Sequence, residues 1–254
     1  MPYGMYVSAS GAEAQSRYIE VLANNLANAD TVGFKQDFPI MKARHSEAIE
    51  QGLDLPGSQS INNLGGGTAV THSMTDYSRG TVKQTGNPTD LAIDDRDGNA
   101  FFVIKRNGEE LLTRAGNFKL SSSGQLQTQD GDAVMSDEGT PITIDPEAGP
   151  YIVRQNGTIQ QGDAEFTISL VKPVSLGDLA KAGQNLFKPL ADTIPVEANE
   201  RQVRSGYLEL SSVRPIQAMT DLIKATRAYE ANVRLIQHQD QMMGSLVNRV
   251  LRQS

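Results

Sequence analysis

The sequence contains no cysteine and no tryptophan among its 254 residues. The lack of cysteine excludes disulfides, thiolate zinc sites, iron–sulfur clusters and cysteine nucleophiles, and it is compatible with a protein that leaves the reducing cytosol. No apolar run approaches the length of about 18 residues that indicates a membrane-spanning helix, so we expect no membrane insertion. The 30 acidic residues outnumber 23 lysines and arginines. This balance argues against a nucleic-acid partner, because few positive charges are free to neutralise phosphates.

Patterns typical of catalytic or metal sites are also missing. The three histidines, His45, His72 and His238, have no paired-ligand spacing. The glycine run at 65–67 lacks the Gly-Lys-Ser/Thr ending of a phosphate loop, and the acidic turn at 94–99 would place isoleucine at two ligand positions of a calcium loop. No nucleophile-elbow spacing occurs. We therefore expect no catalytic residue, no metal and no cofactor, and hence no enzyme.

The first 20 residues do not have the pattern of a secretory signal peptide. They lack both a basic stretch and a continuous apolar stretch before a cleavage site. If the protein leaves the cytoplasm, we expect it to use another route and to keep its N-terminus.

Both ends of the chain have the pattern of helices. From residue 5 to residue 29 apolar side chains recur at helical spacing, and the Asn and Gly residues at 28–33 are typical of a helix end. After Pro215, which a first helical turn accepts, apolar residues repeat every seven positions over about five heptads. Residues 1–34 hold one basic and three acidic residues, whereas the last 41 hold six basic and three acidic. Opposite charge and matched apolar stripes predict that the two helices pair.

Two helices cannot cover apolar stripes on several faces by themselves, because a stable helix needs packing partners along its apolar side. We therefore predict a subunit whose terminal helices complete their core with neighbouring copies. For Asn25 and Asn28 the alternative is that they fix the helix register or cap its end. The predicted assembly interface consists of Ile19, Leu22, Asn25, Leu26, Asn28, Met219, Leu222, Tyr229, Val233, Ile236, Met243, Val247 and Val250.

The middle of the chain has the pattern of strands and turns. Asn107-Gly108 lies between two apolar runs, which is the strongest short-range signal of a β-hairpin, and Asp130-Gly131 and Asn156-Gly157 repeat it. The predicted fold class is mainly β with α-helical termini, in which a single β-rich domain is looped out of a paired N- and C-terminal helical coiled coil.

The same patterns predict four parts along the chain. Residues 1–34 form the N-terminal helix, which pairs with 214–254. Residues 35–80, rich in Ser, Gln, Asn and Gly beyond a short helix, form a linker or a segment that becomes ordered on assembly. Residues 81–205 form the β-rich domain, and residues 206–254 form the C-terminal connector and helix.

Four sequence blocks, in order along the chain, resemble the signatures of the flagellar rod, hook and hook-associated protein family. They are Ala-Asn-Asn-Leu-Ala-Asn-Ala-Asp-Thr-Val-Gly-Phe-Lys at 23–35, Thr-Gly-Asn-Pro-Thr-Asp-Leu-Ala-Ile at 85–93 with Phe-Phe-Val at 101–103, Leu-Thr-Arg-Ala-Gly-Asn-Phe at 112–118, and Ser-Gly-Tyr-Leu-Glu at 205–209 with Arg-Ala-Tyr-Glu-Ala-Asn at 227–232. Together they span nearly the whole chain. The family usually has Gly-x-Gly before Phe-Phe, where this chain has an acidic turn ending in Asn99-Ala100.

The resemblance implies a structural subunit of the bacterial flagellar basal-body rod, in the periplasm. Proteins of this family are exported unfolded through the flagellar type III apparatus without a cleavable signal peptide. They polymerise helically into a drive shaft that carries torque from motor to hook, with the terminal helices in an inner coiled-coil layer and the β domain outside. The implied partners are other copies, other rod proteins and the export apparatus, with the ring bushing around the rod as a further option.

Two members of the family fit the length of the chain. Ser-Ser-Val-Arg-Pro-Ile-Gln-Ala-Met at 211–219 resembles the longer proximal rod protein, whereas the blocks at 87–93 and 227–230 are shared with or closer to the distal rod protein. We favour the longer proximal rod protein and keep the distal rod protein as the alternative.

Two unrelated functions remain as rivals. A soluble β-rich module that binds cell wall or carbohydrate would need an aromatic platform, which a chain without tryptophan does not suggest. A hydrolase would need a catalytic constellation that the sequence does not contain.

Overall fold

The computed structural model describes residues 3–55, 58 and 65–251, with only the backbone of Glu47 and Val250. The chain divides into two compact units. The helical unit comprises residues up to Ala27, Asp37–Thr75, and residues from Arg214 onward. The β unit comprises Asn28–Gln36 and Asp76–Val213. Helical ends and a β-rich middle were predicted, and the structure confirms this coarse division.

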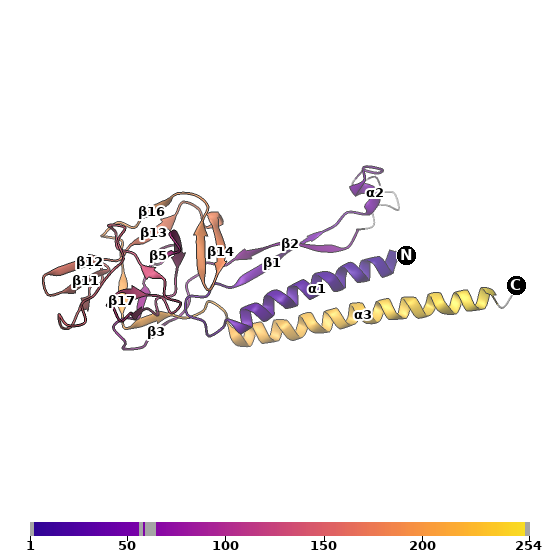
Figure 1. Ribbon diagram of the computed structural model, residues 1–254. Helices are drawn as coiled ribbons and strands as arrows, with labels where there is room; N and C mark the ends of the chain where they lie inside the picture. Colours follow the sequence, from indigo (N-terminus) through magenta and orange to yellow (C-terminus); the bar gives the residue numbers. More distant parts are fainter. Residues whose placement is uncertain (1–2, 56–57, 59–64, 252–254) are drawn as a thin grey trace. The chain divides into compact units, whose positions relative to one another are not determined.

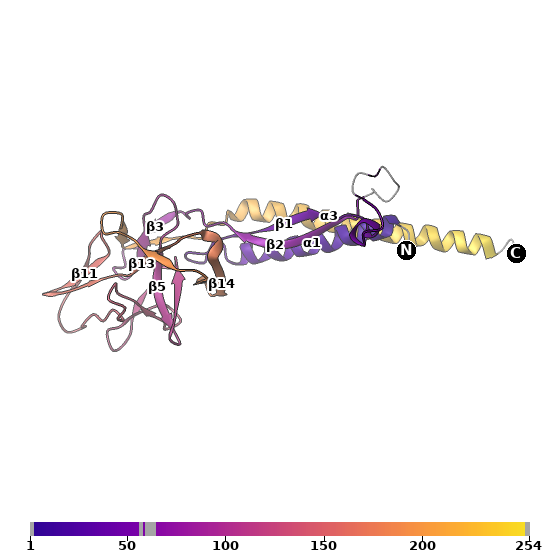
Figure 2. The same cartoon turned by 90° about the horizontal axis from the view of Figure 1, so that it is seen from above.

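The helical unit contains two long helices and a β-hairpin. Helix α1 (Tyr3–Ala27) and helix α3 (Pro215–Leu251) lie side by side in opposite directions (Figure 1; Figure 2). Strands β1 (Asp37–Ala43) and β2 (Thr68–Thr75) form an antiparallel hairpin that also contacts α1, and the short helix α2 (Glu47–Glu50) lies between these strands. The segment 35–80, interpreted from the sequence as a linker or an assembly-ordered segment, therefore carries secondary structure; its residues 56–57 and 59–64 lie outside the described ones.

Small residues bring α1 and α3 close together. A Cβ atom added at Gly4 would lie 2.7 Å from Gln239 Nε2, and one added at Gly11 would lie 3.2 Å from Asn232 Nδ2. The two glycines are seven residues apart, and so are the two amides that face them. Further along the pair, the buried α3 residues are alanines rather than large apolar side chains, namely Ala218 and Ala225. The helices thus approach through glycine, alanine and amide groups, which permit a short interaxial distance.

The β unit holds many short strands. The largest sheet in the described residues has nine strands, in the order β14-β15-β6-β5-β9-β8-β7 with β13 paired to β5 and β16 to β13. Smaller sheets are β10-β11-β12, β17-β4 and β18-β3. The bounds are β3 (Val82–Gln84), β4 (Leu91–Ile93), β5 (Phe101–Arg106), β6 (Glu109–Thr113), β7 (Lys119–Leu120), β8 (Leu126–Gln127), β9 (Ala133–Val134), β10 (Ile152–Val153), β11 (Thr158–Gln161), β12 (Ala164–Thr167), β13 (Leu170–Pro173), β14 (Leu179–Gly183), β15 (Leu186–Pro189), β16 (Thr193–Pro195), β17 (Val203–Ser205) and β18 (Tyr207–Glu209), with a 3-10 turn at Leu176–Asp178.

Turn chemistry explains why the central hairpin forms where the sequence predicted it. Asn107 and Gly108 connect β5 to β6 with φ angles of 52° and 87°, which is the left-handed pair that a two-residue hairpin turn requires. The prediction at this position is confirmed. Next to the hairpin, the Arg106 guanidinium donates to both carboxylate oxygens of Asp132, at 2.8 and 2.7 Å. This hydrogen bond and the positive charge lower the pKa of Asp132.

Strand β5 lies at the centre of the β unit and is buried on both faces. Phe102 and Ile104 point into the larger core, and Phe101 and Val103 point into a second one. Because successive strand residues point to opposite faces, burial on both sides explains the continuous apolar run instead of an alternating one. In the second core the Phe101 and Phe187 rings lie 5.6 Å apart in an edge-to-face arrangement.

No helix of the described residues is long and apolar enough to cross a membrane.

Candidate functional site

Two features of the molecule are candidates for function: the uncovered side of α3 in the helical unit, and a cluster of buried charges in the β unit. The first contains four of the thirteen residues predicted from the sequence as an assembly interface. The second was not predicted.

On α1, the predicted interface residues are mostly covered within the helical unit. Leu22 and Asn25 are buried, and Ile19 and Leu26 are half-buried. The Asn25 amide donates to Asp37 O at 2.8 Å and its carbonyl accepts from Asp37 N at 2.9 Å. This pair of bonds ties the start of β1 to α1. Asn28 belongs to the β unit, where it is half-buried and accepts from the Thr31 hydroxyl at 3.2 Å.

On α3, the predicted residues divide into two groups. Leu222, Val233 and Ile236 are half-buried. The side chain of Val250 lies outside the described residues. The other four are exposed, and they are Met219 at 51%, Tyr229 at 38%, Met243 at 42% and Val247 at 53%. On α3, the structure therefore places one part of the predicted assembly interface near other side chains and leaves the other part exposed to solvent.

Several more apolar side chains of α3 are exposed, and the sequence analysis missed them. They are Ile216, Ile223, Leu235, Met242, Leu246 and Leu251. A seven-residue template selects only one stripe of a helix, whereas these residues widen the apolar surface beyond it. Counting every apolar residue around α3 would have found them.

The C-terminal part of α3 extends beyond the first turn of α1 (Figure 1). Gly4, next to the start of α1 at Tyr3, already faces Gln239, so the last dozen or so residues of α3 run past the end of its partner. This overhang, defined as residues 242–251, exposes Met242, Met243, Leu246, Val247 and Leu251. Its other side carries the exposed polar residues Ser245 and Asn248, and the exposed Gln241 lies one turn before Ser245 on the same side of the helix. The overhang is therefore an amphipathic helix whose apolar side is not covered by any of the described residues.

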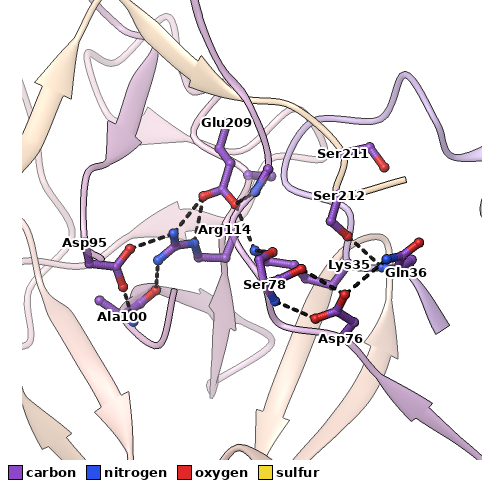
Figure 3. Close-up of polar contacts among 12 residues, drawn as sticks. Lys35, Gln36, Asp76, Ser78, Asp95, Ala100, Arg114, Glu209, Ser211 and Ser212 are labelled. Atoms are coloured by element: carbon purple, nitrogen blue, oxygen red, sulfur yellow. Dashed lines mark hydrogen bonds and ion pairs between the residues drawn. The ribbon is translucent and has the colours of Figure 1, made fainter. Parts of the chain in front are cut away.

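The buried charges of the β unit form one connected cluster of Lys35, Asp95, Arg114 and Glu209 (Figure 3). The side chains of Lys35, Arg114 and Glu209 are at most 1% exposed. The Lys35 ammonium donates to Glu209 Oε1 at 2.8 Å. The Arg114 guanidinium donates to Glu209 Oε2 at 2.9 Å and to Asp95 Oδ1 at 2.8 Å. Two positive and two negative groups thus balance within the cluster.

Backbone groups complete the hydrogen bonding of this cluster. Lys35 Nζ donates to Ser78 O at 2.8 Å, Arg114 Nη1 donates to Ala100 O at 2.5 Å, and Gly80 N donates to Glu209 Oε1 at 2.9 Å. Buried charges are tolerated when they are paired and hydrogen-bonded in this way.

The segment before Lys35 is held in place by close packing. Gly33 has a φ of 68°, and a Cβ atom there would lie 2.5 Å from Ala115 N, so only glycine fits. Phe34 is buried, with the Lys181 ammonium 4.9 Å from its ring centroid. The Gly-Phe-Lys triplet at 33–35 is therefore a docking segment in which each residue makes a different contact.

A second tight approach positions Arg114. A Cβ atom at Gly116 would lie 1.7 Å from Leu91 O, and Leu91 N donates to Gly116 O at 2.9 Å. The block at 112–118 is thereby fixed against β4, which itself pairs with β17. All four sequence blocks that carry the family resemblance contribute residues to this region of the β unit.

Burial and neighbouring charges shift the pKa values of Lys35, Asp95 and Arg114 in opposite directions. Burial lowers the pKa of Lys35, and the charge of Glu209 offsets this effect only in part. Burial would raise the pKa of Asp95, but the hydrogen bond and charge of Arg114 outweigh it and lower the pKa. Burial disfavours the charged form of Arg114 as well, but the charges and hydrogen bonds of Glu209 and Asp95 together outweigh it, so the pKa of Arg114 is raised. The cluster therefore favours the anionic form of Asp95 and the cationic form of Arg114.

Within the described residues, no group of three or more His, Asp or Glu side chains could hold a metal ion. The buried cluster presents its charges to one another and to backbone groups rather than to solvent. It can therefore hold segments of the chain together.

Comparison with known proteins gives consistent matches along the chain. Three family models match: "Flagella basal body rod protein" over residues 5–35, "Flagellar hook protein FlgE/F/G D1 domain" over residues 96–161, and "Flagellar basal body rod FlgEFG protein C-terminal" over residues 204–249. The flagellar basal-body rod protein FlgF of Caulobacter vibrioides is 35% identical over 251 residues, which cover 98% of each chain. The flagellar basal-body rod protein FlgG of the same species is 32% identical, and the match covers 93% of this chain and 95% of the relative. FlgG of Bacillus subtilis is 30% identical, and the match covers 96% of this chain and 97% of the relative.

Proposed function

This chain belongs to the flagellar basal-body rod protein family, and from this premise we propose that it is a structural subunit that polymerises helically through its terminal helices. In the assembled rod these helices form a coiled-coil layer, and the polymer carries torque from the motor to the hook. The partners are other copies of the chain, other rod proteins and, during export, the flagellar type III apparatus. The ring bushing around the rod is a further candidate partner. The site of action is the rod in the basal body.

One observation in this chain supports polymerisation most directly: the uncovered apolar surface of α3. Contiguous exposed apolar side chains are costly in water and usually mark a surface that another protein covers. The overhang is the clearest part of this surface, because its apolar side is exposed in the part of the chain that the structure describes, while its other side is polar. The proposed assembly interface therefore comprises the exposed members of the predicted set together with the additional apolar residues of α3.

Within the family, we propose the longer proximal rod protein. Support comes from the block at 211–219, which resembles that protein at the point where the β unit ends and α3 begins. The distal rod protein remains the alternative.

A charge placed on the apolar side of the overhang tests the assembly proposal. The double variant Met243→Asp/Val247→Asp puts two carboxylates where a neighbouring copy would cover them, and burying unpaired charges is strongly unfavourable. We expect a cell that carries only this variant to form no complete rods in electron micrographs and to be non-motile in soft agar.

The matched control is Gln241→Asp/Ser245→Asp, which adds the same two charges to the polar side of the same helix. It should support normal motility, and both variants should have the wild-type circular dichroism and thermal transition. Normal rods with Met243→Asp/Val247→Asp, or equal loss with both variants, would contradict the proposed interface.

A further inference from the structure

Two connecting segments of the β unit lie next to each other, although they are far apart in sequence. The N-connector, residues 28–36, directly follows α1, and the C-connector, residues 207–213, leads into α3. Gly33 N donates to Glu209 O at 2.8 Å and Ser212 N donates to Phe34 O at 3.0 Å. A third bond joins Gln36 N to the Ser212 hydroxyl at 3.1 Å. The connectors therefore dock against one another as well as against the rest of the β unit.

Each connector also has its own contacts with the remainder of the β unit. On the N-connector, Lys35 O accepts from Lys181 Nζ at 2.8 Å and Val32 O accepts from Asn185 Nδ2 at 2.9 Å. On the C-connector, Leu210 N donates to Thr81 O at 2.8 Å. These contacts alone would let either connector dock without the other.

The buried charges make such half-docking unfavourable. The N-connector supplies the cation Lys35, the C-connector supplies the anion Glu209, and the rest of the β unit supplies Arg114 and Asp95. With both connectors docked the four charges cancel. If only the C-connector docks, the cluster has one surplus negative charge, and if only the N-connector docks it has one surplus positive charge. A buried unpaired charge is far costlier than a paired one.

We propose that the cluster is a latch that closes only when both connectors are present, so the two segments that lead to α1 and α3 dock together and release together. The latch residues of the two connectors, Lys35 and Glu209, are 174 residues apart in the sequence. When one connector is displaced from the β unit, the other connector is therefore released as well. The inference concerns the single chain and does not depend on the proposed assembly.

Hydrogen exchange of the full chain, read by mass spectrometry over a series of low urea concentrations, tests the latch. Peptides from 28–36 and 207–213 report on the connectors, and peptides from the β5–β6 hairpin report on the core. In the wild-type chain both connectors should open with the same dependence on urea, before the hairpin does.

The variant Lys35→Met changes only the N-connector. It should accelerate exchange in both connectors by about tenfold or more, because the buried cluster is left with one surplus negative charge. Exchange in the hairpin should stay within about twofold of the wild type. The matched control is Lys172→Met, which removes a partly exposed ion pair with Glu200 and should leave both connectors unchanged.

Two outcomes would overturn the latch: acceleration in 28–36 without acceleration in 207–213, or equal acceleration of connectors and hairpin. If Lys35→Met does not fold, the wild-type urea series decides by itself, since independent opening of the two connectors contradicts the proposal. Gly33→Ala provides a second perturbation, because its Cβ displaces the N-connector sterically and leaves every charge in place. If the latch exists, exchange should accelerate in both connectors in this variant too.

Discussion

Removal of the central anion of the buried cluster should destabilise the β unit more than any single surface change. Glu209 accepts from Lys35 Nζ at 2.8 Å, from Arg114 Nε at 2.9 Å and from Gly80 N at 2.9 Å. In Glu209→Gln the side chain keeps its shape, but one acceptor becomes a donor that faces other donors. Two buried cations then share one anion, Asp95.

The expected magnitudes follow from this geometry. Breaking a buried ion pair by removing one partner costs about 3–5 kcal/mol, and Glu209→Gln should reach this range because the carboxylate is 1% exposed. Lys35→Met should cost about 1–3 kcal/mol, because it leaves Ser78 O without its donor while Glu209 keeps Arg114 and Gly80 as partners. In the double variant Lys35→Met/Glu209→Gln the remaining pair, Arg114 and Asp95, is neutral. Its cost should fall below the sum of the single costs by at least about 1 kcal/mol.

Urea unfolding at neutral pH measures these differences. Tyrosine fluorescence can follow the β unit, since the chain has no tryptophan and Tyr77 lies in the second core. Lys172→Met is the control, and loss of its partly exposed pair should cost less than about 1 kcal/mol. Additive costs in the double variant would show that the charges of Lys35 and Glu209 act independently, and a Glu209→Gln cost no larger than that of the control would refute the reasoning outright.

Substitutions at three other positions should have distinct effects on stability. Gly33→Ala should lower the melting temperature much more than Gly108→Ala. Both glycines have positive φ, but a Cβ at Gly33 would lie 2.5 Å from a backbone atom, whereas nothing lies within 4 Å of a Cβ at Gly108. Equal shifts of the melting temperature in calorimetry would contradict this. Gly11→Leu should loosen the α1–α3 pair, since even a Cβ there lies 3.2 Å from an α3 amide, and exchange of the α1 amides should rise while the β5–β6 hairpin is unaffected. The lowered pKa of Asp132 means that its carboxylate stabilises the fold above the unfolded pKa of about 3.9 and loses this effect as pH falls through the lower folded value. The difference in unfolding free energy between wild type and Asp132→Asn should therefore shrink below about pH 4, and a constant difference down to pH 2 would refute the assignment.

Features of this chain that depend on local physics could be predicted from its sequence. The Asn-Gly turn at 107–108 was predicted because two residues with positive φ are needed between twisted strands, and those two residues alone supply them. The terminal helices were predicted because apolar spacing and the absence of proline act within a few turns.

Local patterns were less informative about what covers each surface. The heptad template on α3 selected residues such as Leu222, which is half-buried, and Val247, which is 53% exposed, without distinguishing them. It also gave no role to Gly4 and Gly11, because a glycine in a helix is significant only when another element approaches it. Which stripe of α3 packs against α1 depends on the partner, and the spacing within one helix does not contain that information.

By itself, the sequence determined that the ends of this protein are helical, that its middle is built of short strands, and that its motif blocks belong to the flagellar rod family. Only the tertiary structure decided that Lys35, Arg114 and Glu209, one from each of three of those blocks, meet in a single buried cluster. Charged residues are ordinarily solvated, so nothing in a linear sequence marks these three as exceptions. Their pairing spans 95 and 174 residues, and it becomes favourable only when the folded chain removes all of them from water at the same place.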